Sequence, residues 1–304
     1  MTEPNLFQLS EMLPSVELCF DEPLSRHTSF RIGGPAEAMA FPRNPEELAQ
    51  CLQAARKLGV TPRIMGAGTN ILAPDGGVPG LILCLKDAFD GMEQQSDTCI
   101  RVMAGVTMTR AAVFAANLGL SGLEFAHGIP GTVGGGVYMN AGAYGGEICQ
   151  VCTRVAVMDM AGNTRLFSGE EMDFSYRHSR LEAEPGIVVW AEFTLTPADP
   201  ETVREKMREL MAKRKASQPL DMPSAGSAFK RPVGGYAAAL IDRAGLKGFR
   251  VGGAAVSEKH AGFAINLGGA TAADVLALLE QVSDKVYADS GIRLEPEIRL
   301  WQGL

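Results

Sequence analysis

Residues 128–146 read GIPGTVGGGVYMNAGAYGG, and this stretch determines how the rest of the sequence is interpreted. It holds eight glycines, interleaved with Pro130, Thr132, Asn140 and Tyr144. Glycine permits positive φ and lets main-chain N–H groups approach a ligand without a Cβ in the way. The stretch is therefore interpreted as a loop, either one that binds an anion or one that is purely structural.

A second loop of this kind, GAGTN at residues 66–70, leaves the end of an expected strand, and its Thr69 and Asn70 add side-chain donors. Either loop alone is explained by a tight turn. Together they favour a dinucleotide, because the charge of a pyrophosphate is spread over two phosphates. The stretch GAGTNI lacks the third glycine of G-x-G-x-x-G, and no acidic residue closes a βαβ unit about 20 positions later, so a Rossmann site is excluded. The absence of G-x-x-x-x-G-K-[ST] excludes a P-loop ATPase.

The elements expected around these loops follow one another in mixed order. The clearest is a helix over 44–59, which Asn44 caps and Gly59 ends. Pro45 suits its first turn, and Glu47 is expected to complete a capping box with Asn44. Mixed order without strict βαβ alternation predicts an α+β fold rather than a doubly wound sheet. Further helices are expected at 109–118, 201–215, 236–244 and 272–288, and strands at 37–41, 62–65, 80–85, 99–105, 154–160, 164–167, 187–195, 249–256, 262–267 and 293–301.

The 304-residue chain carries 28 Lys and Arg against 35 Asp and Glu, a net charge of −7. This balance argues against a large basic surface for nucleic acid, while leaving room for a local basic pocket that binds a phosphorylated small molecule. The N-terminal stretch carries acids where a signal peptide carries a basic segment, and no run approaches the roughly 20 apolar residues that span a bilayer. We therefore expect a cytoplasmic protein with no nucleic-acid or membrane partner.

Six cysteines are scattered along the chain, and Cys149 and Cys152 form a C-x-x-C pair. A structural zinc site needs two further ligands at fitting spacing, and neither a second C-x-x-C nor an H-x3-5-H occurs. The four histidines are widely separated and form no metal pattern. The cysteines are expected to be small buried hydrophobic residues, with a redox pair as the alternative for the C-x-x-C, and no metal is expected.

Seven blocks of sequence, in this order, closely resemble the family of UDP-N-acetylenolpyruvoylglucosamine reductases over nearly the whole chain. They are HTSFRIGGPAE (27–37), MGAGTNIL (65–72), GIPGTVGGGVYMNAGAYGGEI (128–148), FSYRHSRL (174–181), SAGSAFKRP (224–232), GLKGFRVGGAAVSEKHAGFAIN (245–266) and LEPEIRLWQG (294–303). The resemblance implies an α+β protein whose FAD-binding region has the vanillyl-alcohol-oxidase-like (PCMH-type) fold. It implies FAD-binding subdomains at 1–95 and 96–200 and a C-terminal substrate-binding domain at 201–304.

The resemblance also implies where ligands bind. FAD is expected to place its pyrophosphate on the two glycine loops and its flavin near the stretch from Asn140 to Ala143. NADPH is the implied co-substrate, a UDP-sugar the implied substrate, and a monomer or weak oligomer the expected state. The expected FAD-binding residues are Gly66, Ala67, Gly68, Thr69, Asn70, Gly128, Pro130, Gly131, Thr132, Gly134, Gly135, Asn140, Gly142 and Ala143, and the expected substrate-binding residues are Tyr144, Gln218 and Lys230.

Three positions match the catalytic residues of the family: Arg177 in YRHS, Ser227 in GSAFK and Glu297 in PEIR. The implied reaction reduces an enolpyruvyl ether to UDP-N-acetylmuramate in peptidoglycan precursor synthesis, with hydride from the flavin N5. Hydride addition leaves negative charge on the carboxylate side, which the guanidinium of Arg177 can stabilise. Ser227 is expected to protonate the adjacent carbon, and Glu297 to interact with the developing acid or orient a proton-bearing partner.

Two positions depart from the family pattern. Gly136 stands where alanine is more usual, and Arg231 stands where one subgroup has asparagine. Only nine residues separate Arg177 from Ile187, so the long tyrosine-bearing insertion of that subgroup is absent. The resemblance is therefore to the second, shorter subgroup.

Other interpretations of the same residues stay open. Ser227 and Lys230 form S-x-x-K, in which penicillin-binding proteins place a nucleophilic serine and a lysine on one helix face. Pro223 and Pro232 leave little room for such a helix, and S-D-N and K-T-G are absent. An FAD-dependent oxidase of the same fold acting on another substrate is the nearer alternative, and a non-catalytic nucleotide-binding module is the third.

Overall fold

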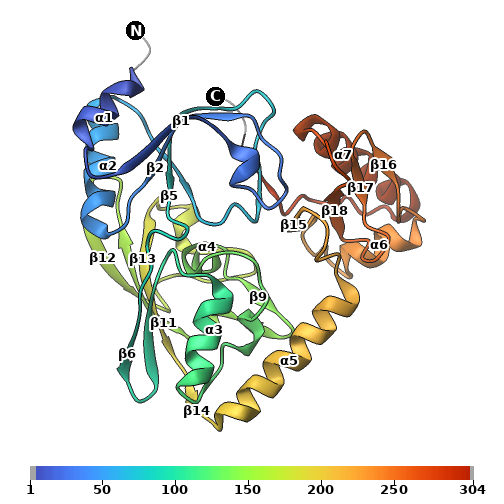
Figure 1. Ribbon diagram of the computed structural model, residues 1–304. Coiled ribbons are helices and arrows are strands. Elements are labelled where there is room, and N and C mark those ends of the chain that lie inside the picture. Colours follow the sequence, from blue (N-terminus) through green and yellow to red (C-terminus); the bar gives the residue numbers. More distant parts are fainter. Residues whose placement is uncertain (1–4, 302–304) are drawn as a thin grey trace. The chain divides into compact units, whose positions relative to one another are not determined.

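The computed structural model describes residues 5–301 (Figure 1). The chain forms two compact units, each assembled from separate segments. Unit 1 comprises residues up to 20, 38–67 and 80–213, and unit 2 comprises 21–37, 68–79 and the chain from 214 onward. The division into three domains expected from the sequence stays a prediction.

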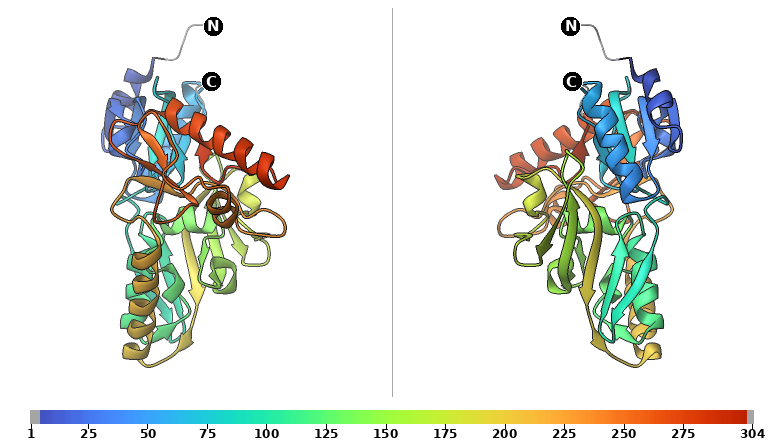
Figure 2. Two further views of the ribbon diagram at one scale, coloured as in Figure 1. Left: turned by 90° about the vertical axis from the view of Figure 1, so that its right-hand side faces the viewer. Right: turned by 90° about the vertical axis from the view of Figure 1, so that its left-hand side faces the viewer.

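Helix α2 (Pro45–Lys57) lies across a four-stranded sheet, as the right-hand view of Figure 2 shows. The strands run in the order β1-β2-β5-β3, and β3 is parallel to β5. Leu48 and Leu52 of the helix are buried in one core with Leu81 and Leu83 of β5. The strands are β1 (Glu17–Pro23), β2 (Pro35–Phe41), β3 (Arg63–Met65) and β5 (Val78–Cys84), and the short helix α1 spans Leu9–Met12.

Helix α2 begins and ends as expected, but its first turn is bonded differently. Asn44 Oδ1 accepts the Glu47 N–H at 2.8 Å, and Gly59 follows the helix with a φ of +70°. The Glu47 carboxylate accepts hydrogen bonds from the Arg43 main-chain N–H at 2.8 Å and from Arg43 Nη2 at 2.7 Å. The prediction of a capping box is wrong because the Glu47 carboxylate is hydrogen-bonded to Arg43 and not to Asn44. The side-chain hydrogen bonds from Arg43 lower the pKa of Glu47.

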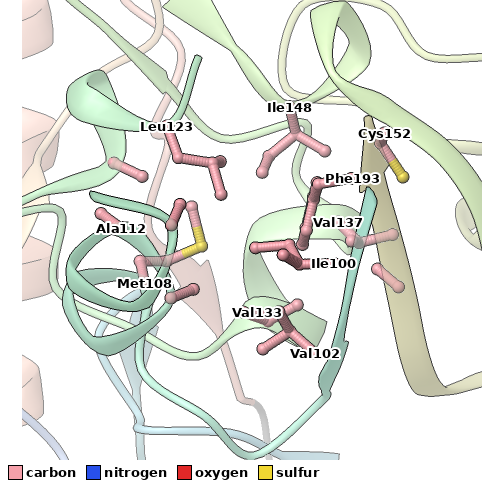
Figure 3. Close-up of a cluster of buried hydrophobic side chains, with 14 of the residues drawn as sticks. Ile100, Val102, Met108, Ala112, Leu123, Val133, Val137, Ile148, Cys152 and Phe193 are labelled. Atoms are coloured by element: carbon pink, nitrogen blue, oxygen red, sulfur yellow. The ribbon is translucent and has the colours of Figure 1, made fainter. Parts of the chain in front are cut away.

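A five-stranded antiparallel sheet forms the centre of unit 1, in the order β12-β11-β13-β7-β6. The strands expected at 154–160 and 164–167 are present and pair as an antiparallel hairpin, with Val155 of β11 opposite Phe167 of β12. Val102 of the sheet, Met108 of α3 and Val137 of α4 belong to one buried cluster (Figure 3). The elements are β6 (Met92–Ser96), β7 (Cys99–Met103), α3 (Met108–Asn117), β11 (Cys152–Met158), β12 (Thr164–Ser168) and β13 (Ile187–Thr194), with the short pair β8 (Leu120–Ser121) and β14 (Thr196–Pro197).

A short helix, α4 (Val133–Tyr138), lies inside the stretch that the sequence predicts as a loop. Glycines are poor helix formers, and close packing explains two of the three in this helix. A Cβ on Gly134 would lie 3.0 Å from Ala104 Cβ, and a Cβ on Gly136 would lie 2.7 Å from Met108 Sδ. The loop prediction is wrong for these 6 residues because close tertiary packing overrides helix propensity. The contact with Met108 also explains why glycine stands at position 136.

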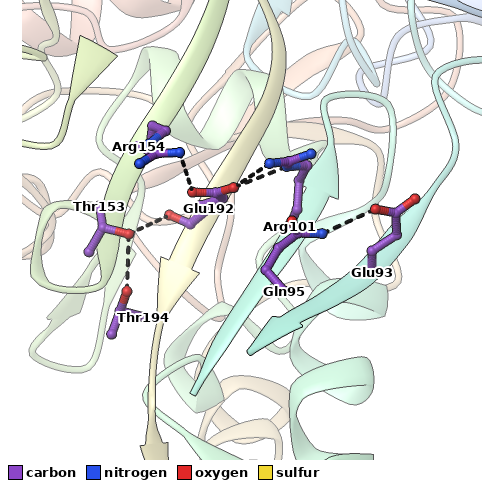
Figure 4. Close-up of polar contacts among 7 residues, drawn as sticks. All are labelled: Glu93, Gln95, Arg101, Thr153, Arg154, Glu192 and Thr194. Carbon is purple, nitrogen blue, oxygen red and sulfur yellow. Dashed lines mark hydrogen bonds and ion pairs between the residues drawn. The ribbon is translucent and has the colours of Figure 1, made fainter. Parts of the chain in front are cut away.

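Charged side chains cross the five-stranded sheet on the face opposite Val102 (Figure 4). Glu192 of β13 accepts two hydrogen bonds from Arg101 of β7, at 3.1 and 2.6 Å, and lies 3.7 Å from Arg154 of β11. The guanidinium of Arg101 also lies 4.2 Å from the ring centroid of Trp190. Glu192 is only 7% exposed, so the two arginines compensate a nearly buried carboxylate within the sheet.

Unit 2 has its own sheet, in the order β15-β18-β17-β16, and its own core. Val275 of helix α7 is buried with Ala254 of β17, and the same core includes Phe30 and Leu72 from much earlier in the sequence. Asn266 Nδ2 donates to the Phe30 carbonyl at 3.0 Å. Helix α5 (Pro200–Ser217) leads into this unit, whose further elements are β15 (Ser224–Ser227), α6 (Ala237–Arg243), β16 (Arg250–Val251), β17 (Ala254–Val256), β18 (Phe263–Asn266) and α7 (Ala272–Ser290).

Two acidic side chains satisfy the first turn of helix α7. Thr271 Oγ1 accepts the Asp274 N–H at 3.0 Å, and Asp274 Oδ2 accepts the Thr271 N–H at 3.1 Å. The carboxylate of Asp75 accepts the N–H groups of Ala272 and Ala273 at 2.7 and 3.1 Å. A carboxylate is favourable at a helix N-terminus, so the loop carrying Asp75 is attached to α7.

The strand expected over 293–301 is only partly regular. Strand β19 (Arg299–Leu300) pairs in parallel with β4 (Ile71–Leu72). Upstream of it, Pro296 forms an isolated bridge with Phe229. The segment is paired with the residues around Phe229 at this point and with β4 from Arg299 onward. The strand predicted from the sequence is therefore irregular because its partner changes.

Within residues 5–301, no helix combines the length and the apolar composition that crossing a bilayer requires. In the same part of the chain, no group of three or more His, Cys, Asp or Glu side chains is arranged to hold a metal ion. Both members of the C-x-x-C pair are free thiols, with Cys149 exposed and Cys152 buried. Burial raises the pKa of Cys152 to about 12, as expected of a small residue in a hydrophobic core.

Candidate functional site

The two predicted glycine loops meet in unit 1. A Cβ built on Gly66 would lie 2.5 Å from Thr132 Oγ1, so the contact requires glycine at position 66. Thr132 is 2% exposed, and its Oγ1 accepts the N–H of Gly135 at 3.4 Å, which caps helix α4. The residue that follows strand β3 and the residue that caps α4 therefore lie in direct contact.

Hydrogen bonds hold the second loop against the first turn of helix α3. The Met108 N–H donates to the Gly131 carbonyl at 3.0 Å, and the Gly128 N–H donates to Thr109 Oγ1 at 3.1 Å. No sequence motif identified Thr109 as part of the site. Its position at the start of an expected helix could have indicated that its hydroxyl is available to a neighbouring loop. Helix α3 thus positions the loop through both its main chain and a side chain.

Three main-chain donors at this meeting point have no protein acceptor within residues 5–301: the N–H groups of Ala67, Gly131 and Thr132. Thr132 forms an isolated antiparallel bridge with Thr107 in which the hydrogen bonds come from neighbouring residues, so its own N–H points away from Thr107. Thr132 is buried, Ala67 and Gly131 are partly exposed, and a diphosphate offers such amides several anionic oxygens. These donors therefore fit the pyrophosphate of the expected FAD.

The remaining part of the first loop, Gly68 to Asn70, belongs to unit 2. Gly68 has a φ of +60°, and a Cβ on it would lie 2.2 Å from the His27 carbonyl oxygen. Its own carbonyl accepts the Ser29 N–H at 3.1 Å. The conformation of Gly68 is therefore set by packing within the protein, and the expected FAD contacts of Gly68, Thr69 and Asn70 stay predictions.

A tight hairpin follows α4, formed by β9 (Gly142–Ala143) and β10 (Gly146–Glu147) with Tyr144 in its turn. Tyr144 has a φ of +53° and is 44% exposed. A Cβ on Gly146 would lie 2.5 Å from the ring of Phe125, so this strand packs too closely for any other residue. The hairpin exposes Tyr144, and its expected contact with the substrate stays a prediction.

Asn140 lies between α4 and this hairpin, at 1% exposure and a φ of +41°. Its Nδ2 donates to the Ser175 carbonyl at 3.0 Å and to Glu147 Oε2 at 3.1 Å. Its Oδ1 accepts the Cys149 N–H at 2.9 Å. The side chain thus holds three protein groups, and its expected place beside the flavin stays a prediction.

Arg177 lies in a two-residue turn of unit 1. Ser175 and His178 exchange both main-chain hydrogen bonds, each at 3.2 Å, which leaves Tyr176 and Arg177 at the tip. Arg177 has a φ of +57°, and its guanidinium lies 5.1 Å from the ring centroid of Tyr176. Non-glycine residues at positive φ are strained, so the surrounding structure must hold this turn in place. The expected catalytic role of Arg177 stays a prediction.

Ser227, Lys230 and Glu297 lie close together in unit 2. Ser227 ends strand β15 and is exposed. The Glu297 N–H donates to the Ala228 carbonyl at 2.9 Å, which places Glu297 on the segment beside Ser227. Lys230 Nζ is paired with Glu295 on the same segment. Main-chain pairing therefore positions these three side chains.

The S-x-x-K interpretation is wrong in its geometry. Ser227 lies in an extended strand, and the N–H of Lys230 donates to the Glu295 carbonyl at 2.9 Å in a strand-like pairing. A serine and a lysine three residues apart share one face only in a helix, so these two side chains do not form the penicillin-binding arrangement.

Gln218 follows helix α5, and its Oε1 accepts a hydrogen bond from Nη1 of the buried Arg214 at 3.1 Å. The predicted site residues thus divide between the units. Unit 1 contains Gly66, Ala67, the 128–146 stretch and Arg177, and unit 2 contains Gly68, Thr69, Asn70, Gln218, Ser227, Lys230 and Glu297.

Known protein families match both parts of this chain. Residues 36–168 match the family described as FAD binding domain, and residues 218–301 match UDP-N-acetylenolpyruvoylglucosamine reductase, C-terminal domain. The UDP-N-acetylenolpyruvoylglucosamine reductase of Heliobacterium modesticaldum is 46% identical over 280 residues, which cover 92% of this chain and 89% of that relative. The chain belongs to the family of UDP-N-acetylenolpyruvoylglucosamine reductases.

A second member of this reductase family, from Caldanaerobacter subterraneus, is 44% identical over 300 residues and covers 99% of each chain. The crystal structure of the UDP-N-acetylenolpyruvylglucosamine reductase from Thermus caldophilus has a TM-score of 0.81 and 36% identity, covering 94% of this chain and 99% of that chain. These likenesses confirm the family resemblance and the α+β fold with an FAD-binding region.

The matched ranges also locate the predicted residues within the reductase family. Both glycine loops fall inside the FAD-binding match, and Ser227 and Glu297 fall inside the match to the C-terminal domain. Arg177 lies between the two matched ranges, so its assignment depends on the YRHS block and on its strained turn.

Proposed function

We propose that this chain reduces the enolpyruvyl ether of UDP-N-acetylenolpyruvoylglucosamine to UDP-N-acetylmuramate, with FAD as cofactor and NADPH as co-substrate, in the cytoplasm during peptidoglycan precursor synthesis. The observation that carries the proposal is the meeting of Gly66 with Thr132, which gathers main-chain donors suited to a dinucleotide in a chain of this reductase family. The same fold could serve an FAD-dependent oxidase, and the family membership favours the reductase.

The donors of Ala67, Gly131 and Thr132 would bind the diphosphate of FAD, because they lie together without protein acceptors among the described residues. Close packing at Gly66 brings the two loops into position for this contact. The other expected FAD contacts are Gly68, Thr69, Asn70, Gly128, Pro130, Gly134, Gly135, Asn140, Gly142 and Ala143.

Bound FAD would supply the hydride that adds to the terminal carbon of the enolpyruvyl group. The guanidinium of Arg177 would stabilise the negative charge that develops on the carboxylate side, where a planar fork of donors suits a carboxylate. The exposed hydroxyl of Ser227 would protonate the adjacent carbon. Glu297, on the neighbouring segment, would orient the developing acid or its proton donor.

Tyr144, Gln218 and Lys230 would contact the UDP-sugar. Tyr144 is exposed on a strained turn, and Lys230 has a charged amine suited to a phosphate. The side-chain oxygen of Gln218 accepts from Arg214, and its amide N–H₂ group would donate to the UDP-sugar. We expect the enzyme to act as a monomer or weak oligomer, which sedimentation at several concentrations would test.

The proposal is tested by following the flavin spectrum of the purified protein without oxygen. NADPH should bleach the flavin, and UDP-N-acetylenolpyruvoylglucosamine should restore its colour with formation of UDP-N-acetylmuramate. Acid precipitation should release the flavin, because binding through main-chain donors is noncovalent. A reduced flavin that reacts with oxygen to give peroxide but is not reoxidised by this substrate would indicate the oxidase. A colourless protein would indicate a module without redox function.

A further inference from the structure

The turn that carries Arg177 is attached to unit 1 on both sides. Before the turn, the Ser175 carbonyl accepts Asn140 Nδ2 at 3.0 Å. After it, Ser179 Oγ donates to the carbonyl of Tyr138, the last residue of α4, at 2.8 Å. Ser179 is 0% exposed and Asn140 1% exposed. Both attachments therefore reach the short segment at the end of α4, and the side chain that makes each contact is buried.

The side chain of Asn140 is itself held in one orientation. Its Nδ2 also donates to Glu147 Oε2 at 3.1 Å, and its Oδ1 accepts the Cys149 N–H at 2.9 Å. A rotation of the amide by half a turn would place Oδ1 against two acceptors, the Glu147 carboxylate and the Ser175 carbonyl. The turn is thus fixed relative to the glycine stretch as well as within its own segment.

We infer that Ser179 and Asn140 are positioning residues for Arg177. The inference rests on the proposed function, in which Arg177 meets the carboxylate of the substrate. Arg177 has a φ of +57°, a conformation that a non-glycine residue keeps only when its surroundings impose it. Removal of the Ser179 hydroxyl leaves the Tyr138 carbonyl without this donor and lets the turn relax away from α4. A displacement of about 1 Å at a reacting contact reduces the rate on the order of 100-fold.

Ser179→Ala tests the inference, with Ser121→Ala as a matched control. Ser121 Oγ donates to Glu124 Oε1 at 2.6 Å elsewhere in unit 1. Ser179→Ala should slow flavin reoxidation at saturating UDP-N-acetylenolpyruvoylglucosamine by roughly 10- to 100-fold, while flavin content and NADPH-dependent reduction stay at wild-type levels. Ser121→Ala should leave all three unchanged. In the flavin-free protein, amide hydrogen exchange at Ser175 and His178 should become faster in Ser179→Ala alone.

A double-mutant cycle with Arg177→Ala separates positioning from a general structural role. If Ser179 acts through Arg177, then adding Ser179→Ala to Arg177→Ala should cause no further loss of reoxidation rate. Losses that multiply, or a Ser179→Ala variant that reoxidises at the wild-type rate, would overturn the inference. Should Ser179→Ala not fold, the nearly isosteric Ser179→Cys replaces it, with an intermediate loss expected and wild-type behaviour counting against the inference. A wild-type protein whose reduced flavin ignores this substrate would instead refute the proposed function.

Discussion

The two units present their predicted reactive groups in opposite ways. In unit 1, Arg177 lies in a strained turn that hydrogen bonds from two buried side chains attach, and Gly66 packs where a Cβ does not fit. In unit 2, Ser227 and Glu297 are side chains on paired segments whose positions depend on main-chain bonds. A substitution in unit 1 therefore changes geometry together with chemistry, whereas one in unit 2 can change chemistry alone.

Ser227→Ala should show the largest effect and the cleanest chemistry. Because Ser227 is exposed at the end of β15, stability should change by no more than about 0.5 kcal/mol. Stopped-flow spectroscopy should show normal flavin reduction by NADPH, with reoxidation by saturating substrate slowed by about 10²–10⁴-fold through loss of the proton donor. Ser227→Cys should retain more activity than alanine. Weaker substrate binding with an undiminished saturated rate would remove Ser227 from the mechanism.

Gly66→Ala should lower the affinity for flavin, because unit 1 has no space for an added Cβ at this position. Its Cβ would lie 2.5 Å from Thr132 Oγ1, and such overpacking costs about 1–3 kcal/mol, or roughly 5- to 150-fold in flavin affinity if the whole cost falls on the binding conformation. The control is Gly226→Ala in unit 2, where the Cβ would meet no described atom within 4 Å and only the φ of +79° is unfavourable. Fluorescence titration of the flavin-free proteins compares them. Equal affinity in Gly66→Ala and wild type would show that the loops do not bind the cofactor as proposed.

Asp75→Ala should destabilise unit 2 without touching the flavin loops of unit 1. Asp75 accepts two N–H groups in the first turn of α7, and loss of such a cap costs about 1–2 kcal/mol. Asp97→Ala, at an exposed position in unit 1, is the control and should be nearly neutral. Urea unfolding should report the difference, with flavin affinity unchanged in both variants. A neutral Asp75→Ala would show that Thr271 and Asp274 alone satisfy the helix end.

The rates at which thiol reagents modify the cysteines should give the smallest effect. These rates report the opening of unit 1 alone, since all six cysteines lie there. Cys149 is exposed and should react first. Burial raises the pKa of Cys84 to about 11 and those of Cys51 and Cys152 to about 12, so these thiols should react only when unit 1 opens. Cys149→Ser should remove the fast phase of labelling. Rapid labelling of Cys152 in the native protein would contradict its burial.

Elements with strong local signals were predictable from the sequence. The expected helices over 201–215 and 272–288 correspond to α5 (Pro200–Ser217) and α7 (Ala272–Ser290), because apolar periodicity and caps depend on neighbouring residues. Helix α4 was not predictable, since Gly134 and Gly136 are explained only by Ala104 and Met108, which pack against them in the fold.

The same limit applies to the candidate site. The glycine loops and Arg177 stand out by composition and by family motif. Ser179 does not, because its role depends on the Tyr138 carbonyl 41 positions earlier. Periodicity likewise gives no sign that Phe30 belongs to the core of unit 2, since most of the buried residues of that core lie between Ala225 and Ile298.

This placement of Phe30 has a consequence for synthesis on the ribosome. The Phe30 carbonyl can accept its hydrogen bond only after Asn266 has been synthesised, 236 residues later. At a translation rate of about 5–20 residues per second, that interval lasts roughly 10 to 50 s. Most of unit 1 emerges during this time and can form its core from residues already translated. The early segments of unit 2 meanwhile leave Phe30, Ile32 and Leu72 uncovered, a hydrophobic cluster that the nascent chain exposes to chaperones until the last helix is made.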